Sequence, residues 1–275
     1  MARIDTLANF LTDIAAAIKA KTGKTDPITP ANFDTEINNI PTGGDTSIED
    51  AFMSGTQNIE YSNDRITVLN EGVFRYVKNL TSVNLPLITE IKRYSFSECS
   101  ALVNASFAEL TTLGEYAFNY CENLTNLYAP NATRIELSCF KSCKKLEYAN
   151  FPLVTYLGGY AFDYCVGLKE ANFPLATQTN SSVFRDCTSL VKVDFGLLTN
   201  ISNGYFYNCT SLTTLILRAS EVSYLYDSNT FTNTPIANGT GYIYVPDDLV
   251  DSYKTNNNWS KYAAQIKSIS ELEAE

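Results

Sequence analysis

A strict internal repeat is the feature that most constrains this chain. Phenylalanine recurs at every twenty-second position, at Phe74, Phe96, Phe118, Phe140, Phe162, Phe184 and Phe206. Three positions after each Phe stands Cys, or Val in the first copy, and three positions further stands Leu in every copy. No residue is inserted or deleted across these seven copies. Such strict self-similarity predicts a solenoid in which each copy forms one turn.

Within each copy, the residues after the Leu alternate between apolar and polar. The apolar pairs include Val83 and Leu85, Ala105 and Phe107, Ala149 and Phe151, Val193 and Phe195, and Leu215 and Leu217. A period of two predicts a short strand with one buried face. A Thr and an aliphatic residue follow, as at Thr89 and Ile91. We therefore expect one strand and a return segment per turn, stacked into a parallel sheet over one continuous core.

The seven cysteines are explained by the repeat. Six of them occupy the repeated position, and Cys139 precedes Phe140 at the position that Ser95, Ala117 and Ala161 occupy in three other copies. An odd number of Cys, no CxxC pair and no histidine argue against a disulfide framework or a zinc site. We expect reduced cysteines that pack as small buried residues, with no metal and no cofactor.

Composition excludes several functions. Histidine is absent, which removes the commonest general base and metal ligand, and no GxSxG, HExxH or phosphate-binding Gly loop occurs. Carboxylates that could serve a glycosidase are scattered over polar positions. The net charge of −10 argues against nucleic-acid binding. The sequence has no run of about 18 apolar residues, so membrane insertion is not expected. We expect no enzymatic activity.

The repeat pattern, LxxAxF or LxxVxL followed by Pro, a Thr-containing turn and YAFxxC, resembles the BspA-like leucine-rich repeats of bacterial surface and phage-associated proteins. The resemblance covers roughly residues 60 to 235 and implies an α/β-type leucine-rich-repeat solenoid with a parallel sheet. Departures lie at the ends, where Val77 replaces Cys and Phe231 stands three positions later than the period places it. Atypical terminal copies are typical of solenoid caps.

Residues 1–42 have a different pattern, with apolar residues at helical spacing. They predict two short helices that form a docking module. The expected docking residues are the apolar ones: Leu7, Leu11, Ile14, Ile18, Phe33 and Ile37. A unit of this size is marginal alone, so it must pack against the first repeat, a second copy or another protein. Residues 43–58 are the expected linker and entry to the solenoid, which spans residues 59–235.

The phrase LANFLTDIAAAIKAKTGKTDPITPANFDTEINNI resembles the N-terminal module of phage tail and other virion proteins of Gram-positive hosts. The resemblance implies docking to phage tail or baseplate proteins and a location in the virion after assembly in the host cytoplasm. Because tail fibres are often trimeric, a homo-oligomer is expected. No signal-peptide pattern is found at the start of the chain, which favours the virion over the alternative, the bacterial cell surface.

Residues 236–275 are predicted to cap the solenoid. Gly241 to Val245 predicts a last strand, and Pro246 opens an amphipathic helix through Tyr253. Four apolar residues are expected to anchor the end of the chain: Trp259, Tyr262, Ile266 and Ile269. Such a segment would cover the open edge of the sheet.

Candidate ligand-binding residues are the outward positions of the strands, which line one surface in a solenoid. These pairs begin at Ser82 and Asn84 and end at Thr214 and Ile216. The preferred site is the middle of the surface, comprising Asn126, Tyr128, Tyr148, Asn150, Glu170, Asn172, Lys192 and Asp194. Amide, hydroxyl and aromatic groups suit a glycan or a protein, although polar residues also face water without binding anything. A second series, Tyr76, Tyr120 and Tyr164, is explained equally by packing and by binding.

The leading hypothesis is a non-enzymatic, receptor-binding phage virion protein that recognises a host-surface protein or glycan through its repeat face. One alternative is a structural or decoration component of the virion that binds no receptor. Another is a bacterial cell-surface adhesin.

Overall fold

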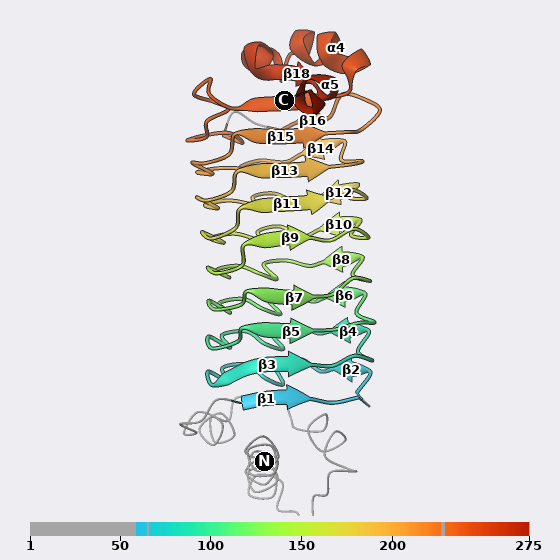
Figure 1. Ribbon diagram of the computed structural model, residues 1–275, viewed down its shortest axis with the longest axis vertical. Helices are drawn as coiled ribbons and strands as arrows, with labels where there is room; N and C mark the ends of the chain where they lie inside the picture. The colour runs from blue at the N-terminus through green and yellow to red at the C-terminus, as the bar shows by residue number, and fades with distance from the viewer. Residues whose placement is uncertain (1–58, 65, 227–228, 275) are drawn as a thin grey trace, which may run out of the picture.

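The computed structural model describes residues 59–64, 66–226 and 229–274. The chain winds into a straight solenoid whose turns stack along the long axis, with a helical segment over the C-terminal end (Figure 1). The predicted parallel repeat fold is confirmed. The predicted docking residues Leu7, Leu11, Ile14, Ile18, Phe33 and Ile37 and the linker 43–58 lie outside the described residues.

In the regular copies, the first series of strands begins at or shortly after the repeated Leu, as predicted. It consists of β1 (Ile59–Ser62), β3 (Leu80–Asn84), β5 (Asn104–Ser106), β7 (Asn126–Tyr128), β9 (Tyr148–Asn150), β11 (Glu170–Phe173), β13 (Lys192–Phe195), β15 (Thr214–Leu217), β17 (Tyr242–Val245) and β18 (Ile266–Ser268). Within the repeats, paired strands run parallel and their partner residues lie one period apart, as Glu170 with Lys192. The 22-residue period of the sequence therefore determines which residues pair between neighbouring strands.

A second series of strands corrects the prediction of one strand per turn, because the return segment also pairs. It consists of β2 (Val68–Leu69), β4 (Glu90–Ile91), β6 (Thr112–Leu113), β8 (Arg134–Ile135), β10 (Tyr156–Leu157), β12 (Gln178–Thr179), β14 (Asn200–Ile201) and β16 (Tyr224–Leu225). The repeated Thr just before these strands adds hydrogen bonds between turns. The Thr111 hydroxyl donates to the Thr89 carbonyl at 2.9 Å, and the Thr133 hydroxyl donates to the Thr111 carbonyl at 3.2 Å.

The expected continuous core is confirmed, because the buried apolar residues form one cluster from Tyr61 to Ile266, although the hydrogen-bonded sheets around it are divided. In the described part of the chain, the first series divides between β7 and β9 and the second between β12 and β14. At the first break, β7 carries Leu127 and Ala129 where the neighbouring strands carry Ala and then Phe. Leu127 is half-buried, whereas Ala105 and Ala149 are buried. The ladder stops only on the side of β9, since Leu127 still pairs with Ala105 of β5.

A column of stacked rings runs through the core. From Phe74 through the repeated Phe to Phe206 and Phe231, successive ring centroids lie 5.2 to 5.8 Å apart at interplanar angles of 3° to 16°. All eight rings are buried, including the predicted degenerate copy at Phe231. Burying each ring contributes roughly 1.5–3 kcal/mol. The column holds consecutive turns in register.

The repeated cysteines are buried beside this column, as predicted. Each donates its Sγ–H to the carbonyl of the Phe of the preceding turn, at 2.9 to 3.2 Å. Burial raises the pKa of these thiols, and of Cys139, well above the ordinary value. The thiol therefore serves as a small apolar group with one donor for an inner carbonyl.

Non-glycine residues with left-handed backbone recur in the turns, with φ between 51° and 66°. They include both Tyr116 and Tyr120, on either side of Phe118. Each such residue costs roughly 1–2 kcal/mol. The conformation aims the amide at the next turn, where Tyr116 N–H donates to the Leu137 carbonyl at 2.9 Å and Tyr120 N–H donates to that of Lys141 at 2.8 Å. Bonds between turns therefore compensate for the local strain.

The C-terminal segment caps the end of the solenoid. The predicted last strand is present as β17, and η1 (Asp247–Leu249), α4 (Val250–Thr255), η2 (Ser260–Gln265) and α5 (Ile269–Glu273) follow it or flank β18. Trp259 is buried and its indole N–H donates to the Ser223 carbonyl at 2.6 Å. Tyr262 and Ile266 are buried as predicted, whereas Ile269 is only half-buried. None of the helices in the described part of the chain has the length and hydrophobicity that spanning a bilayer requires.

Candidate functional site

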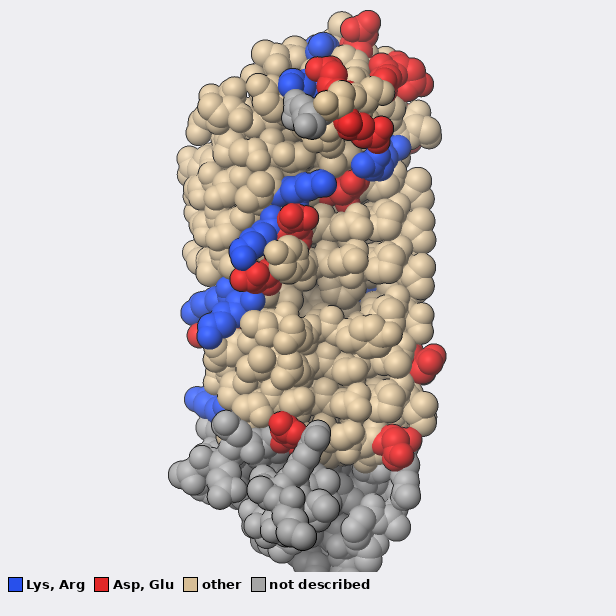
Figure 2. All heavy atoms as spheres, in the orientation of Figure 1, with Lys and Arg blue, Asp and Glu red and all other residues tan. Residues whose placement is uncertain are grey.

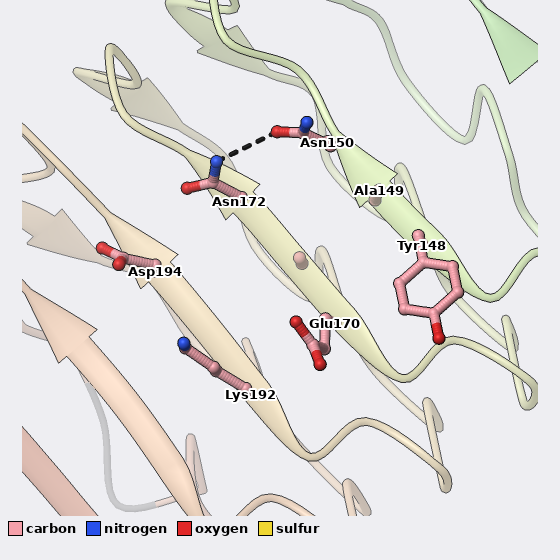
Figure 3. A pocket seen from close by; sticks show the side chains of 8 residues that line it. Tyr148, Ala149, Asn150, Glu170, Asn172, Lys192 and Asp194 are labelled. Carbon is pink, nitrogen blue, oxygen red and sulfur yellow. Dashed lines mark hydrogen bonds between the residues drawn. The ribbon is translucent and has the colours of Figure 1, made fainter.

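The predicted binding residues lie on the outer surface of β7, β9, β11 and β13, which we call the sheet face. Six of them surround one open hollow of about 500 Å³: Tyr148, Asn150, Glu170, Asn172, Lys192 and Asp194 (Figure 3). Asn126 and Tyr128 are exposed on β7 but do not line this hollow, since β7 belongs to the other part of the divided sheet. The structure therefore brings together six of the eight predicted residues.

Amide side chains form short ladders along this face. The Asn172 side-chain amide donates to Asn150 Oδ1 at 3.0 Å, and that of Asn126 donates to Asn104 Oδ1 at 2.7 Å. Each amide has two N–H donors and an oxygen with two lone pairs. One bond therefore orients each side chain and leaves hydrogen-bonding capacity for a ligand.

Two tyrosines provide the largest exposed apolar area of the site. The side chains of Tyr128 and Tyr148 are 58% and 59% exposed, although both belong to strands. A tyrosine offers a rigid ring with a polar tip, which suits contact with a partner at low entropic cost.

Charged residues cross the sheet face on a diagonal (Figure 2). Opposite charges pair between adjacent turns: Lys144 lies 2.7 Å from Glu122 and Lys169 lies 2.8 Å from Glu147. Arg218 donates two hydrogen bonds to Asp194, from Nε to Oδ1 at 2.9 Å and from Nη2 to Oδ2 at 3.0 Å. These bonds raise the pKa of the guanidinium. The sequence prediction missed Arg218, which continues the outward series of Thr214 and Ile216, because only two outward positions per strand were considered and Arg218 lies directly after β15.

The sequence predicts that Ile216 faces outward on the binding surface, and this prediction is wrong, since Ile216 is only 1% exposed. Tyr244, its partner on β17, is also buried, at 3%. Figure 1 shows α5 in front of this end of the sheet, and the Ser270 amide of α5 donates to Asp247 Oδ1 at 3.2 Å. The cap therefore closes the sheet face at its C-terminal end, and the accessible surface ends near β13.

The second tyrosine series does not reach the sheet face. Tyr76, Tyr120 and Tyr164 occupy left-handed turn positions after the repeated Phe. Tyr120 and Tyr164 are 43% and 46% exposed, whereas Tyr76 is half-buried beneath the guanidinium of Arg75, whose Cζ lies 4.6 Å from the ring centroid. Exposure makes the first two available to a partner but assigns them no role.

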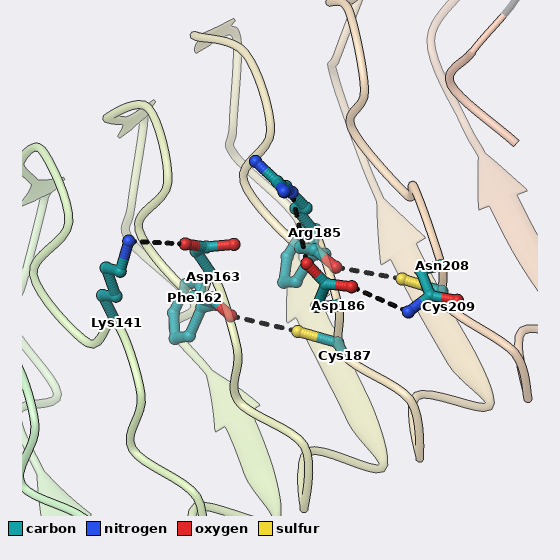
Figure 4. A network of polar contacts seen from close by, with 9 residues as sticks. Lys141, Phe162, Asp163, Arg185, Asp186, Cys187, Asn208 and Cys209 are labelled. Carbon is teal, nitrogen blue, oxygen red and sulfur yellow. Dashed lines mark hydrogen bonds and ion pairs between the residues drawn. The ribbon is translucent and has the colours of Figure 1, made fainter. Parts of the chain in front are cut away.

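A buried ion pair lies on the same edge as these turns (Figure 4). Lys141 Nζ is 2.9 Å from Asp163 Oδ2, and the Asp163 side chain is 2% exposed. Burial raises the pKa of the Asp163 carboxyl, while Lys141 acts in the opposite direction. Further along, the Asn208 side chain donates to Asp186 Oδ1 at 2.7 Å. These contacts join turns to one another, so the network is structural.

The described residues contain no group of three or more side chains positioned to hold a metal ion. The side chains on the sheet face can donate and accept hydrogen bonds and can stack an aromatic ring against a ligand. We found in it no nucleophile placed beside a general base, and so no basis for a catalytic assignment.

Comparison with known proteins reveals likeness to a repeat family. Residues 46–169 and 133–243 match the family described as BspA type leucine rich repeat region, in six copies. That description is of a repeat architecture and indicates no catalytic family. Comparison with curated proteins finds no match.

Two solved structures are similar. The leucine-rich repeat protein of T. pallidum has 26% identity and a TM-score of 0.51, with 55% of this chain and 76% of that chain covered. A protein described as a leucine rich cell surface protein of Faecalibacterium prausnitzii has 14% identity and a TM-score of 0.40, with 74% and 82% covered.

Proposed function

Because the chain belongs to the family of BspA-type leucine-rich repeat proteins, we propose that it is a non-enzymatic binding scaffold. Its sheet face recognises a protein or a glycan on the surface of a host cell. The observation that carries this proposal is the hollow lined by Tyr148, the Asn150–Asn172 amide pair and the charged side chains of Glu170, Lys192 and Asp194.

The hollow is suited to binding because its residues are held in place. They stand on paired strands whose inward neighbours, Ala149, Ala171 and Val193, are buried. A rigid surface loses little conformational entropy when a partner binds. The mixture of aromatic, amide and charged groups matches the composition of protein recognition surfaces, in which a central aromatic residue carries much of the affinity.

We further propose that the chain is a phage tail protein, docked through residues 1–42 and assembled as an oligomer. This proposal depends on the resemblance of the N-terminal phrase to virion modules, and those residues lie outside the described part of the chain. Under it, the solenoid presents the sheet face to the host.

Binding is tested with purified, fluorescently labelled full-length chain and a panel of Gram-positive bacterial cells. We expect saturable binding that weakens on the order of tenfold in Tyr148→Ala, as for a central aromatic contact. Tyr164→Ala removes a comparably exposed ring from another surface and should bind like the parent chain. No saturable binding at about 10 μM, or equal loss in both variants, contradicts recognition through the sheet face.

Location is tested by immunogold electron microscopy with an antibody against the solenoid. Label on phage tails of induced cultures supports the virion proposal. Label on the envelope of uninfected cells supports the alternative of a bacterial surface adhesin. Label on tails without any binding to cells supports a structural component.

A further inference from the structure

A second hollow lies away from the sheet face, at the corner that follows the second series of strands. We call it the corner groove. It has a volume of about 470 Å³, and its lining includes Tyr160, Asn180, Ser181, Ser202, Asn203 and Tyr226. None of these residues belongs to a strand of the first series. The groove is therefore distinct from the hollow of the proposed function.

The groove forms where the second series of strands is interrupted, between β12 and β14. Tyr205 occupies the position before the repeated Phe, where earlier turns have smaller residues: Val73, Ser95, Ala117, Cys139, Ala161 and Val183. This bulky side chain is fully buried, and its hydroxyl lies 2.7 Å from that of Thr179, which replaces the usual aliphatic residue of the strand. Tyr205 thus contacts the short Thr179 side chain of the preceding turn, and the two turns stay joined by the 3.0 Å bond from Phe184 N–H to the Tyr205 carbonyl.

The lining of the groove results from a change along one column of the repeat. In the first turns this column carries Arg93 and Glu115, which pair at 3.3 Å and are 48% and 45% exposed. In the later turns the same column carries Gly159, Ser181 and Asn203. Gly159 has no side chain to fill the space, and a Cβ there would come no closer than 3.4 Å to the Ser181 carbonyl oxygen. The column thus changes from charged to neutral where the hollow opens.

Aromatic rings flank the groove. Tyr226 is 54% exposed and is supported by Tyr224, whose ring lies 4.7 Å away at an interplanar angle of 72°. Tyr160 has a left-handed backbone, with φ of 56°, that is tied to the next turn by a 3.1 Å bond from its amide to the Ser181 carbonyl. The Asn180 side-chain amide donates to the Tyr156 hydroxyl at 2.9 Å. The walls and floor are therefore held in place without a ligand.

We propose that the corner groove binds an uncharged oligosaccharide. Asparagine amides and serine hydroxyls both donate and accept, as sugar hydroxyls do, and exposed tyrosine rings cover the apolar C–H faces of sugar rings. No Lys, Arg, Asp or Glu lines the groove, although the chain as a whole carries a net charge of −10. The Lys141 cation lies near these lining residues, with Nζ 6.0 Å from the Tyr160 ring centroid, but it is already paired with Asp163 at 2.9 Å. An acidic glycan or a phosphate group therefore has no unpaired cation in the lining to replace its hydration.

Saturation-transfer NMR on the full-length chain tests the proposal. The probes are cellopentaose, maltopentaose and chitopentaose, which are neutral, and pentagalacturonate, which is acidic. We expect saturation transfer to at least one neutral pentasaccharide, with affinity reduced at least tenfold in Tyr226→Ala and Tyr160→Ala. Tyr148→Ala, on the sheet face, should leave this signal unchanged.

Three outcomes overturn the proposal: no transfer to any neutral probe at millimolar concentration, equal transfer to the acidic probe, or loss only in Tyr148→Ala. Circular dichroism of each variant establishes that loss of signal does not reflect unfolding. Because the readouts use different tyrosines, host-cell binding through the sheet face can fail while sugar binding in the groove succeeds, and the reverse.

Discussion

At the scale of single residues, the repeated cysteine has a purely structural role. The position accepts a small apolar side chain, and Val77 fills it in the first copy. Cysteine adds one weak donor to the Phe carbonyl of the preceding turn. Burial also keeps the thiol protonated, because the thiolate would lose its hydration.

This burial predicts unreactive thiols. We expect none of the seven cysteines to react with Ellman's reagent in the folded chain and all seven to react in concentrated guanidinium chloride. Thr210→Cys places a thiol at an exposed position and should add one fast-reacting group. A fast phase in the parent chain would contradict the structural assignment.

The Lys141–Asp163 pair predicts an asymmetric response to substitution. Lys141→Met leaves a buried carboxylate without its cation and should reduce the free energy of unfolding by about 1–3 kcal/mol at pH 7. Asp163→Asn removes the charge that is costly to bury and should be neutral or stabilising. Urea unfolding of both variants measures the difference, and equal losses would show that the ion pair, not the buried charge, dominates.

The same carboxyl predicts a pH dependence. The folded chain binds the Asp163 proton more tightly than the unfolded chain does, because burial raises the pKa from its ordinary value of 3.8. Ionisation therefore costs stability as pH rises from below 3.8 through the raised pKa. The stability of the parent chain relative to Asp163→Asn should fall across this interval and then level off. A relative stability that rises with pH would contradict the direction of the shift.

At the scale of elements, the separation of adjacent turns limits which side chains fit between them. The neighbouring glycines Gly158 and Gly159, which follow β10, show this limit. A Cβ on Gly158 would lie 2.5 Å from both Glu136 C and Leu137 N, whereas a Cβ on Gly159 makes only ordinary contacts. Backbone of the preceding turn cannot move away as a flexible side chain could.

We therefore expect Gly158→Ala to lower the free energy of unfolding by about 1–3 kcal/mol, as overpacking does. Gly159→Ala should be neutral or stabilise the chain by about 0.4–1 kcal/mol through the unfolded state. Denaturant unfolding of the matched pair measures both values. Equal effects would mean that the turns can separate more easily than the core packing indicates.

At the scale of the whole molecule, stability results from contacts between adjacent turns, since the core and both strand series repeat with the period of the sequence. In such an assembly each repeat contacts mainly its neighbours, and stability is close to a sum over turns and interfaces. The register of the repeat is then more important than the number of copies.

This predicts that deleting residues 155–176, one full period, preserves the solenoid by joining Val154 to Thr177 in phase. Deleting residues 155–175 falls one position short of a period and shifts the later Phe, Cys and Leu positions out of register. We expect the first variant to keep the circular dichroism spectrum of the parent, and the second to aggregate or to lose at least about 10 °C in Tm. Similar behaviour of the two variants would contradict the register argument.

The repeat period, the buried Phe, Cys and Leu positions, the first strand series and the closing strand were all predictable from sequence. Each depends on a local rule: alternation predicts a strand, and an invariant spacing predicts stacked turns. Six of the eight candidate site residues also meet at one hollow, because positions one period apart must become neighbours.

Only the tertiary structure decided which outward positions stay accessible and where hollows form. Ile216 fits the outward pattern but is buried beside the cap, whereas Arg218, at the next outward position, stays exposed and binds Asp194. The strand series are interrupted between β7 and β9 and between β12 and β14, although the sequence period continues across both places. A periodic pattern determines the average turn, whereas close packing converts each departure from it into a displacement of backbone. The sequence by itself thus determines the repeated turn, whereas packing between the turns determines the surfaces that can bind a partner.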